Sequence, residues 1–394
     1  MGSETSADSI LIKRLRVSRL FAPEPLEDTD ILIADGRIAA IGRDLAAPAG
    51  WAVSTFEYDD LIAVPAFIDQ HVHVTGGGGE GGCGTRCPEI TTADIAAMGI
   101  ATVVGVLGTD SISRSPADVL AKVRGLRADG IDAYMYTGAY RVPPPTLTGD
   151  LQRDLAWIPE VIGLGEIAIS DHRSSQPQQH EIERLVSETR VGAMLAGKRG
   201  ICHFHLGDGA RGLEPLRRLL RETEIPADQV IPTHVNRRHA LLDEAAAFAL
   251  EFGASVDVTA FDDCPGDHEF SAFNAVSRLL ALGVPPAQIT VSSDCNGSLP
   301  VFDDEGHYDG MRIAGNTVLL SDWQRLVHKE ILPLEQALGL ISTHVARVLG
   351  LEAQKGRLAS GFDADITLLD DDLQPQHTFV AGRCIYSAPD RASD

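Results

Sequence analysis

The chain has 394 residues, enough for one large domain with a smaller one beside it and for a substantial buried core. Asp and Glu number 56 against 33 Lys and Arg, and the resulting net charge of -23 repels phosphates, so neither nucleic acid nor an anionic membrane is expected as a partner. No apolar run approaches the ~20 residues that cross a bilayer, and the N-terminal residues do not resemble a secretion signal, so we expect a cytoplasmic protein.

The first predicted elements are short strands. Residues 10–58 alternate apolar and polar side chains, with turn signals about every ten residues and Asp35-Gly36 as a hairpin turn. Residues 361–387, near the other end, show the same pattern. Neither segment is large enough to bury a sheet face alone. We therefore predict one small β-sandwich domain built from both terminal segments, residues 1–62 and 352–394.

The middle of the chain, residues 63–351, repeats a short apolar run followed by a helix-like stretch. One such stretch begins with Ser115 as N-cap and Pro116 at the first helical position. Eight rounds of strand and helix predict an α/β fold, a (β/α)₈ TIM barrel rather than an open sheet. The predicted strands are 63–74, 101–107, 131–137, 161–170, 200–206, 230–235, 254–258 and 289–294.

The first predicted barrel strand ends in a pair of histidines. In barrels of this kind the chemistry lies at the C-terminal ends of the strands. Side chains alternate along a strand, so His71 and His73 project from the same face, roughly 6–7 Å apart, and can bind one metal ion together. Two half-buried polar residues are the alternative explanation for this motif taken alone.

Residues of the metal-binding type recur at the ends of other predicted strands. His205 ends the fifth strand, His234 the sixth and Asp294 the eighth. Within the apolar run of the fourth strand the only carboxylate is Glu166, and a buried acid has to be paired, protonated or bound to metal. A structural acid paired with an arginine is the alternative for Glu166. Four histidines and one aspartate at a single rim are best explained by a metal site.

Seven motifs in order along the chain carry a family resemblance. They are AFIDQHVHVTGGGGEGG, VVGVLGTDSISR, TGAYRVP, AISDHR, FHLGD, PTHVNR and SSDCNGS, and with the terminal GRIAAIG and GFDADITLLD they cover essentially the whole chain. The sequence resembles the isoaspartyl dipeptidases of the amidohydrolase superfamily. This resemblance implies two Zn²⁺ ions per subunit, with His71, His73 and Asp294 on one ion and His205 and His234 on the other.

One residue departs from the family pattern. Isoaspartyl dipeptidases of this kind bridge the two ions with a lysine carboxylated to a carbamate. Glu166 stands where that lysine would be, after what looks like an added glycine in Gly163-Leu164-Gly165. A carboxylate offers the same pair of oxygens on a shorter side chain. We therefore predict that Glu166 bridges the ions, with a shift of the strand or of the metal spacing; a mononuclear site is the alternative.

The resemblance implies hydrolysis of the β-aspartyl amide bond of isoaspartyl dipeptides. A metal-activated hydroxide would attack the carbonyl, Asp294 would act as general base and then acid, and Tyr140 would stabilise the oxyanion. The charged side chains indicate a dipeptide-like substrate with carboxylates and an amine, because Arg173 and Arg237 suit carboxylates and Glu80 suits an ammonium. Further substrate contacts implied by the resemblance are Gly78, Thr109 and Ser298.

Two other functions stay open at this point. Glu166 is compatible with a different amidohydrolase reaction: deacylation of an N-acyl amino acid, opening of a cyclic amide, or deamination. An inactive barrel that serves as an interaction scaffold is the second alternative, although the retained histidines and Asp294 argue against it. The resemblance also implies a homo-oligomer.

Overall fold

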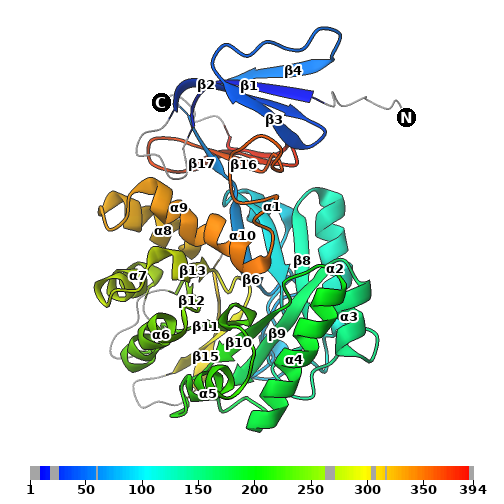
Figure 1. Cartoon of the computed structure of the whole chain (residues 1–394), viewed down its shortest axis with the longest axis vertical. Coiled ribbons are helices and arrows are strands. Elements are labelled where there is room, and N and C mark those ends of the chain that lie inside the picture. Colours follow the sequence, from blue (N-terminus) through cyan, green and yellow to red (C-terminus); the bar gives the residue numbers. More distant parts are fainter. Residues whose placement is uncertain are drawn as a thin grey trace.

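The computed structural model describes residues 9–17, 26–58, 61–261, 271–302, 308–315 and 317–389. A barrel of parallel strands surrounded by helices forms most of the molecule, and a smaller unit of strands lies at one end (Figure 1). Among the described residues, no helix combines the length and the apolarity that crossing a bilayer requires.

The smaller unit is one sheet made from both terminal segments. Its strand order is β18-β17-β16-β5-β1-β2-β3, with β4 paired to β1. Strand β5 joins the two segments, since it runs parallel to β1 and antiparallel to β16. The predicted composite domain is confirmed, while its boundaries at 62 and 352 stay predictions. The strands are β1 (Ser9–Val17), β2 (Leu26–Ala34), β3 (Arg37–Gly42), β4 (Val53–Glu57), β5 (Ile62–Pro65), β16 (Ile366–Leu369), β17 (Pro375–Val380) and β18 (Arg383–Ser387).

This sheet has a hydrophobic core of its own. Ile12 and Ile31 from the N-terminal strands and Ile366 and Phe379 from the C-terminal strands are fully buried in one cluster. The Asp35-Gly36 pair forms the hairpin between β2 and β3, and both residues have positive φ, 50° and 71°. Such backbone angles suit the tight turn of a two-residue hairpin. The alternating pattern of the two terminal segments therefore encodes a shared core.

All eight predicted barrel strands are present, although the first predicted run, 63–74, divides into β5 of the terminal sheet and β6 of the barrel. Strands β6 to β11 pair in chain order, β12 pairs with β13, and every pairing is parallel. The ring closes through Val235 N–H to the Asp257 carbonyl (3.4 Å) and through His73 N–H to the Cys295 carbonyl (2.9 Å). The strands are β6 (Phe67–Val72), β7 (Ile100–Gly105), β8 (Asp132–Thr137), β9 (Val161–Ile169), β10 (Ile201–Leu206), β11 (Val230–Thr233), β12 (Val256–Thr259) and β13 (Ile289–Ser292). The (β/α)₈ barrel is thus confirmed.

Helices follow the strands and cover the barrel (Figure 1). Ser115 caps its helix as predicted, with its hydroxyl accepting from Asp118 N–H and Pro116 at the first position. A strand pair, β14 (Ser298–Phe302) and β15 (Tyr308–Ile313), follows the last barrel strand. The helices are α1 (Thr92–Ala96), α2 (Pro116–Asp129), α3 (Leu151–Trp157), α4 (Gln179–Leu195), α5 (Glu214–Glu222), α6 (His239–Phe252), α7 (Ala272–Ala281), α8 (Val318–His328), α9 (Leu334–Ile341) and α10 (Thr343–Leu349), with short 3₁₀ turns at Cys83–Thr85, Ala227–Gln229 and Pro286–Gln288.

Strand β9 carries a bulge at the added glycine. Gly165 and Glu166 together stand opposite one residue of β10, His203, because the register shifts between Cys202 and Phe204. An extra residue in one strand of a pair bends that strand and re-aims the side chain beside it. A Cβ on Gly165 would lie 2.8 Å from the Cβ of His203, so only glycine fits this close approach. The bulge therefore determines the local course of β9 at Glu166, and a shift of this strand relative to lysine-bearing relatives stays a prediction.

Candidate metal centre

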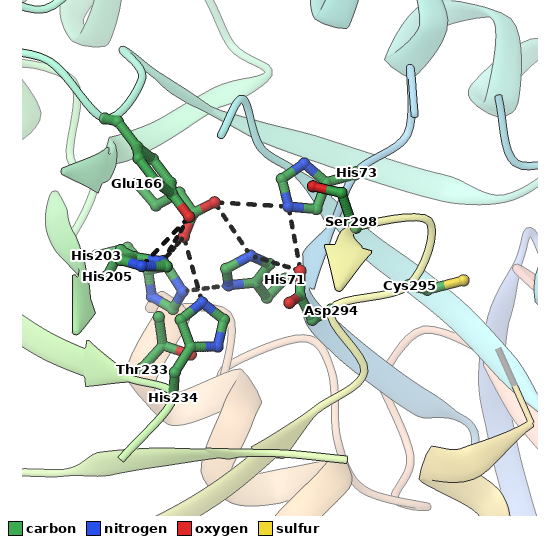
Figure 2. A network of polar contacts seen from close by, with 12 residues as sticks. His71, His73, Glu166, His203, His205, Thr233, His234, Asp294, Cys295 and Ser298 are labelled. Atoms are coloured by element: carbon green, nitrogen blue, oxygen red, sulfur yellow. Dashed lines mark hydrogen bonds and ion pairs between the residues drawn. The ribbon is translucent and has the colours of Figure 1, made fainter. Parts of the chain in front are cut away.

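The predicted metal ligands converge at the C-terminal ends of the barrel strands (Figure 2). Glu166 and His205 lie within β9 and β10, and His234 is the first residue after β11. The parallel strands bring these ends to one rim of the barrel. Six side chains from five strands meet there, and all are buried: His71, His73, Glu166, His205, His234 and Asp294.

The carboxylate of Glu166 lies between two pairs of histidines. Its Oε1 is 3.6 Å from Nε2 of His71 and 3.5 Å from Nε2 of His73. Its Oε2 is 3.1 Å from Nδ1 of His205 and 3.4 Å from Nε2 of His234. Figure 2 shows this carboxylate at the middle of the contacts. Each oxygen therefore faces a different pair of imidazoles, as a ligand shared by two ions would.

Asp294 approaches the first of these pairs. Its Oδ1 is 3.4 Å from Nε2 of His71 and 3.1 Å from Nε2 of His73. The ligand atoms of His71, His73 and Asp294 lie within 4.8 Å of one another, and so do those of His71, Glu166 and His234. Two overlapping sets of ligand atoms thus share His71.

Burial of these polar atoms favours a bound cation. Glu166 is 0% exposed and Asp294 is 5% exposed. Nε2 of His71, Oε1 of Glu166 and Oδ1 of Asp294 are shielded from solvent and make no hydrogen bond. Buried polar atoms without partners are costly, and imidazole nitrogens with carboxylate oxygens form a donor set that zinc accepts. The residues present therefore fit a divalent metal ion.

The pKa values of the site also favour a bound cation. Burial would raise the pKa of Glu166 and of Asp294, but the adjacent imidazoles, above all His71, hold both pKa values well below the ordinary range. Burial would lower the pKa of His71, but the charges of Glu166 and Asp294 raise it well above its ordinary value. The two carboxylates thus favour positive charge at the position of His71, and a bound metal ion would supply such charge.

The backbone is strained at two of the predicted ligands. His234 and Asp294 have φ values of 60° and 52°, in the left-handed region that residues other than glycine rarely adopt. Gly297 N–H donates to the Asp294 carbonyl at 2.9 Å and closes the turn after β13. A Cβ on Gly297 would meet Oδ1 of Asp294 at 2.5 Å, so glycine is needed for this turn. The fold holds both side chains toward the site at the expense of local conformational energy.

His205 is held by groups on both sides of its ring. Its Nε2 lies 2.9 Å from Oδ2 of Asp171, and its Nδ1 lies 2.7 Å from the hydroxyl of Tyr140. Burial would raise the pKa of Asp171, but hydrogen bonds from His205 and Arg173 lower it below the ordinary range. Burial, reinforced by Glu166, raises the pKa of Tyr140 well above its ordinary value, so Tyr140 keeps its proton at neutral pH.

One buried residue of the site was not singled out from the sequence. Nε2 of His203 lies 2.9 Å from Nδ1 of His71, and the His203 ring stacks on Tyr136 with centroids 5.1 Å apart. A signal for it was present, because His203 and His205 are two residues apart on β10 and so share a face. Asp171, which directly follows the fourth predicted strand, was considered from the sequence as an outer residue of the site but was not assigned a role.

The predicted substrate contacts line one pocket beside these ligands. His73, Tyr140 and Asp294 form part of its wall. Asp110 and Arg114, which pair at 3.2 Å and were not predicted, also line it. The six predicted contacts in its wall are Gly78, Glu80, Thr109, Arg173, Arg237 and Ser298. Their roles toward a substrate stay predictions, but the structure brings all of them together.

This fold and this site define a hydrolase of the amidohydrolase class. Residues 208–386 match the Amidohydrolase family. The β-aspartyl dipeptidase of Fervidobacterium islandicum AW-1, solved in complex with β-Asp-Leu dipeptide, is 39% identical over 97% of each chain, with a TM-score of 0.88. The chain therefore belongs to the amidohydrolase superfamily and, within it, to the β-aspartyl dipeptidase family, as its motifs predicted.

More distant relatives share the fold. A dihydroorotase of Lactiplantibacillus plantarum is 24% identical, with 89% of this chain and 86% of the relative covered. The dihydropyrimidinase of Brevibacillus agri NCHU1002 is 17% identical, covers 95% of this chain and 94% of its own, and superposes with a TM-score of 0.64. Similarity at this level shows a common architecture and leaves the reaction to be argued from the site.

Proposed function

We propose that this protein hydrolyses the β-aspartyl amide bond of isoaspartyl dipeptides in a metal-dependent reaction. The observation that carries the proposal is the position of Glu166, whose two oxygens face two separate pairs of imidazoles. The relative solved with β-Asp-Leu supports the choice of substrate. A cytoplasmic location and a homo-oligomeric state belong to the same proposal.

The proposed centre holds two Zn²⁺ ions in each subunit. His71, His73 and Asp294 would hold one ion, His205 and His234 the other, and Glu166 would be shared between them. Zinc in such a donor set supplies Lewis acidity toward a carbonyl and a nucleophilic water at neutral pH.

Two side chains of the pocket would handle the proton and the developing charge. Asp294 is ionised, because the imidazoles of His71 and His73 outweigh the effect of burial on its pKa. In this state Asp294 can accept a proton from the attacking water and deliver it to the leaving amine. Tyr140 keeps its proton and lines the same pocket, so its hydroxyl can donate a hydrogen bond to the oxyanion.

The charges of the pocket match a β-aspartyl dipeptide, which has one ammonium and two carboxylates. Nη1 of Arg173 lies 3.6 Å from Oε1 of Glu80, so these two side chains partly neutralise each other. A zwitterionic substrate would replace this contact with one ion pair on each side. Arg237 would hold the remaining carboxylate. Oγ1 of Thr109 is buried without a hydrogen-bond partner and is available to the substrate, and Gly78 and Ser298 complete the proposed contacts.

The test combines metal analysis with peptide hydrolysis. Zinc-reconstituted protein should cleave β-Asp-Leu and leave the α-linked Asp-Leu intact. Glu166→Ala should lose bound zinc and at least ~100-fold of kcat/KM, because it removes the shared ligand. Glu224→Ala, at an exposed glutamate, is the control and should change neither the zinc content nor kcat/KM. Unchanged zinc content and rate in Glu166→Ala would show that Glu166 is not the bridging ligand.

A different amidohydrolase reaction is the competing proposal. Dihydroorotase and adenine deaminase relatives, 24% and 23% identical, align over 89% and 96% of this chain. The same zinc-reconstituted protein should therefore be offered dihydroorotate, adenine, a hydantoin and N-acyl amino acids. Turnover of one of these without any turnover of β-aspartyl dipeptides would replace the dipeptidase proposal.

A further inference from the structure

His71 occupies the centre of the site, and its two ring nitrogens face different surroundings. Its Nε2 points toward the carboxylates, 3.6 Å from Oε1 of Glu166 and 3.4 Å from Oδ1 of Asp294. Its Nδ1 points the other way, 2.9 Å from Nε2 of His203. His71 and His203 are both fully buried, so water does not compete for this contact.

The position of the ring proton decides whether His71 can bind a metal ion. A neutral imidazole carries one proton, and a nitrogen that binds metal must be the unprotonated one. If Nε2 of His71 is the ligand atom, the proton lies on Nδ1 and needs an acceptor. Among the described residues the hydrogen-bond partner of that nitrogen is Nε2 of His203. An imidazole has one ring nitrogen that can accept when the other carries the proton, so Nε2 of His203 can be that acceptor.

In this arrangement one ring nitrogen of His203 has an unsatisfied hydrogen-bonding group. When its Nε2 accepts, its own proton lies on Nδ1, and that atom is buried without a hydrogen-bond partner. An orphaned buried donor calls for an explanation. The ring is fixed by stacking on Tyr136, and the bulge glycine Gly165 lets β9 pass close to its Cβ. Packing thus holds the His203 ring in contact with His71, although the Nδ1 of His203 lacks a hydrogen-bond partner there.

We propose that His203 is a positioning residue for the metal centre: its Nε2 accepts a hydrogen bond from Nδ1–H of His71 and thereby keeps Nε2 of His71 unprotonated and directed at the metal. This inference rests on the metal-dependent function proposed above. It concerns zinc binding and not the identity of the peptide, so zinc affinity can test it whatever substrate the enzyme cleaves.

The experiment compares two replacements of His203 in the full-length protein. His203→Gln places an amide oxygen near the position of Nε2 and can still accept, whereas His203→Leu cannot. Zinc affinity is measured on the metal-free proteins by competition with a chromophoric chelator. We expect His203→Leu to bind zinc roughly 10- to 100-fold more weakly, as is typical when the outer partner of a ligand histidine is lost, and His203→Gln to remain within about 3-fold of the parent.

Two controls separate this role from simple packing. Tyr136→Phe keeps the ring that stacks on His203 and removes only a hydroxyl without a partner, so its zinc affinity should be unchanged. Thermal unfolding of each metal-free variant reports the packing cost alone. If His203→Leu does not fold, His203→Met replaces it, since methionine has the length of glutamine without a comparable acceptor. Parent-like zinc affinity in the Leu or Met variant, or equal losses in the Gln variant and its apolar counterpart, would overturn the proposal.

Discussion

At the scale of the residue, Glu80 shows how a charge in the pocket is kept in position. Ser298 donates its hydroxyl hydrogen to the carboxylate of Glu80, with 3.0 and 2.9 Å to the two oxygens. Arg173 lies 3.6 Å from the same group. A carboxylate fixed by a neutral donor and near a guanidinium is suited to exchange that guanidinium for a substrate ammonium.

Glu80→Gln tests this role because it keeps the size of the side chain and removes its charge. We expect the KM for β-Asp-Leu to rise by about 10-fold or more, as for loss of a charged hydrogen bond, with a much smaller effect on kcat. Steady-state kinetics with the N-acetylated dipeptide provide the comparison, because that compound has no ammonium. An equal loss for both compounds would mean that Glu80 does not recognise the amine.

The residues that sequence reasoning identified share a simple property: each stands at the end of a predicted strand or in a motif of the family. His71 and His73 are two residues apart on one strand, so their common face follows from the strand period. The residues to which it assigned no role act through contacts between strands. His203 matters because of the distance to His71, and Asp171 because of its contact with His205, and neither distance is encoded in local spacing.

At the scale of the element, the bulge in β9 decides where Glu166 points. We expect Gly165→Ala to cost about 1–3 kcal/mol of unfolding free energy, the usual cost of overpacking, because its Cβ would lie 2.8 Å from that of His203. The zinc affinity of Gly165→Ala should also fall.

Gly125→Ala is the matched control, since that glycine is exposed in helix α2 with open space around it. This substitution should raise the free energy of unfolding by about 0.5–1 kcal/mol. Urea titration measures the free energy of unfolding of both variants. An unchanged free energy of unfolding in Gly165→Ala would contradict the close packing of Gly165 against His203.

Helix α10 carries a histidine that makes stability depend on pH. Burial, together with the charge of Arg347, lowers the pKa of His344 from 6.5 to about 4. Between these values the unfolded chain binds the proton and the folded chain does not, so stability falls as the pH drops from about 6.5 to 4. His344→Gln removes this contribution, and the parent should lose more stability than the variant between pH 7 and pH 4.5. Parallel urea-unfolding profiles against pH would contradict the assignment.

The elements themselves were largely predictable. Each of the eight apolar runs became a barrel strand because a strand buried on both faces needs a continuous apolar sequence. The bulge before Glu166 was not predicted, because it depends on the pairing of β9 with β10. The β14–β15 pair was not predicted, because a short hairpin outside the barrel has no partner that its sequence pattern reveals.

At the scale of the whole molecule, one buried lysine joins the terminal sheet to the barrel. Nζ of Lys355 lies 2.9 Å from Asp132, at the start of β8, and 3.0 and 2.7 Å from Asp363 and Asp365, which precede β16. The lysine is 4% exposed. The composite terminal domain could be predicted because neither segment can bury a face alone. These ion pairs could not, because Lys355, Asp363 and Asp365 lie outside the strands and their spacing from Asp132 carries no signal.

Replacing Lys355 should strongly lower the free energy of unfolding, because it removes the ion pairs between the terminal sheet and the barrel. Lys355→Met removes the buried cation that three carboxylates share, while Arg127 still pairs with Asp132 at 3.1 Å and Arg37 with Asp363 at 3.5 Å. Removal of one partner from a buried ion pair costs about 3–5 kcal/mol. We expect that loss in the unfolding free energy from urea titration, whereas Lys329→Met, at an exposed position, should stay within about 0.5 kcal/mol of the parent. A loss below about 1 kcal/mol in Lys355→Met would show that the contacts of Lys355 do not stabilise the interface.

The sheet shared by both terminal segments also affects how the chain is made. Strand β5 ends at Pro65, but its neighbour β16 begins only at Ile366. At roughly 5–20 residues per second, a ribosome needs about 15–60 s to reach that partner. During this interval one edge of β5 has no partner strand, and unpaired strand edges can pair with strands of other chains. Nascent chains should therefore be more prone than finished molecules to pair with other chains through this edge, because β16 occupies it once synthesis is complete.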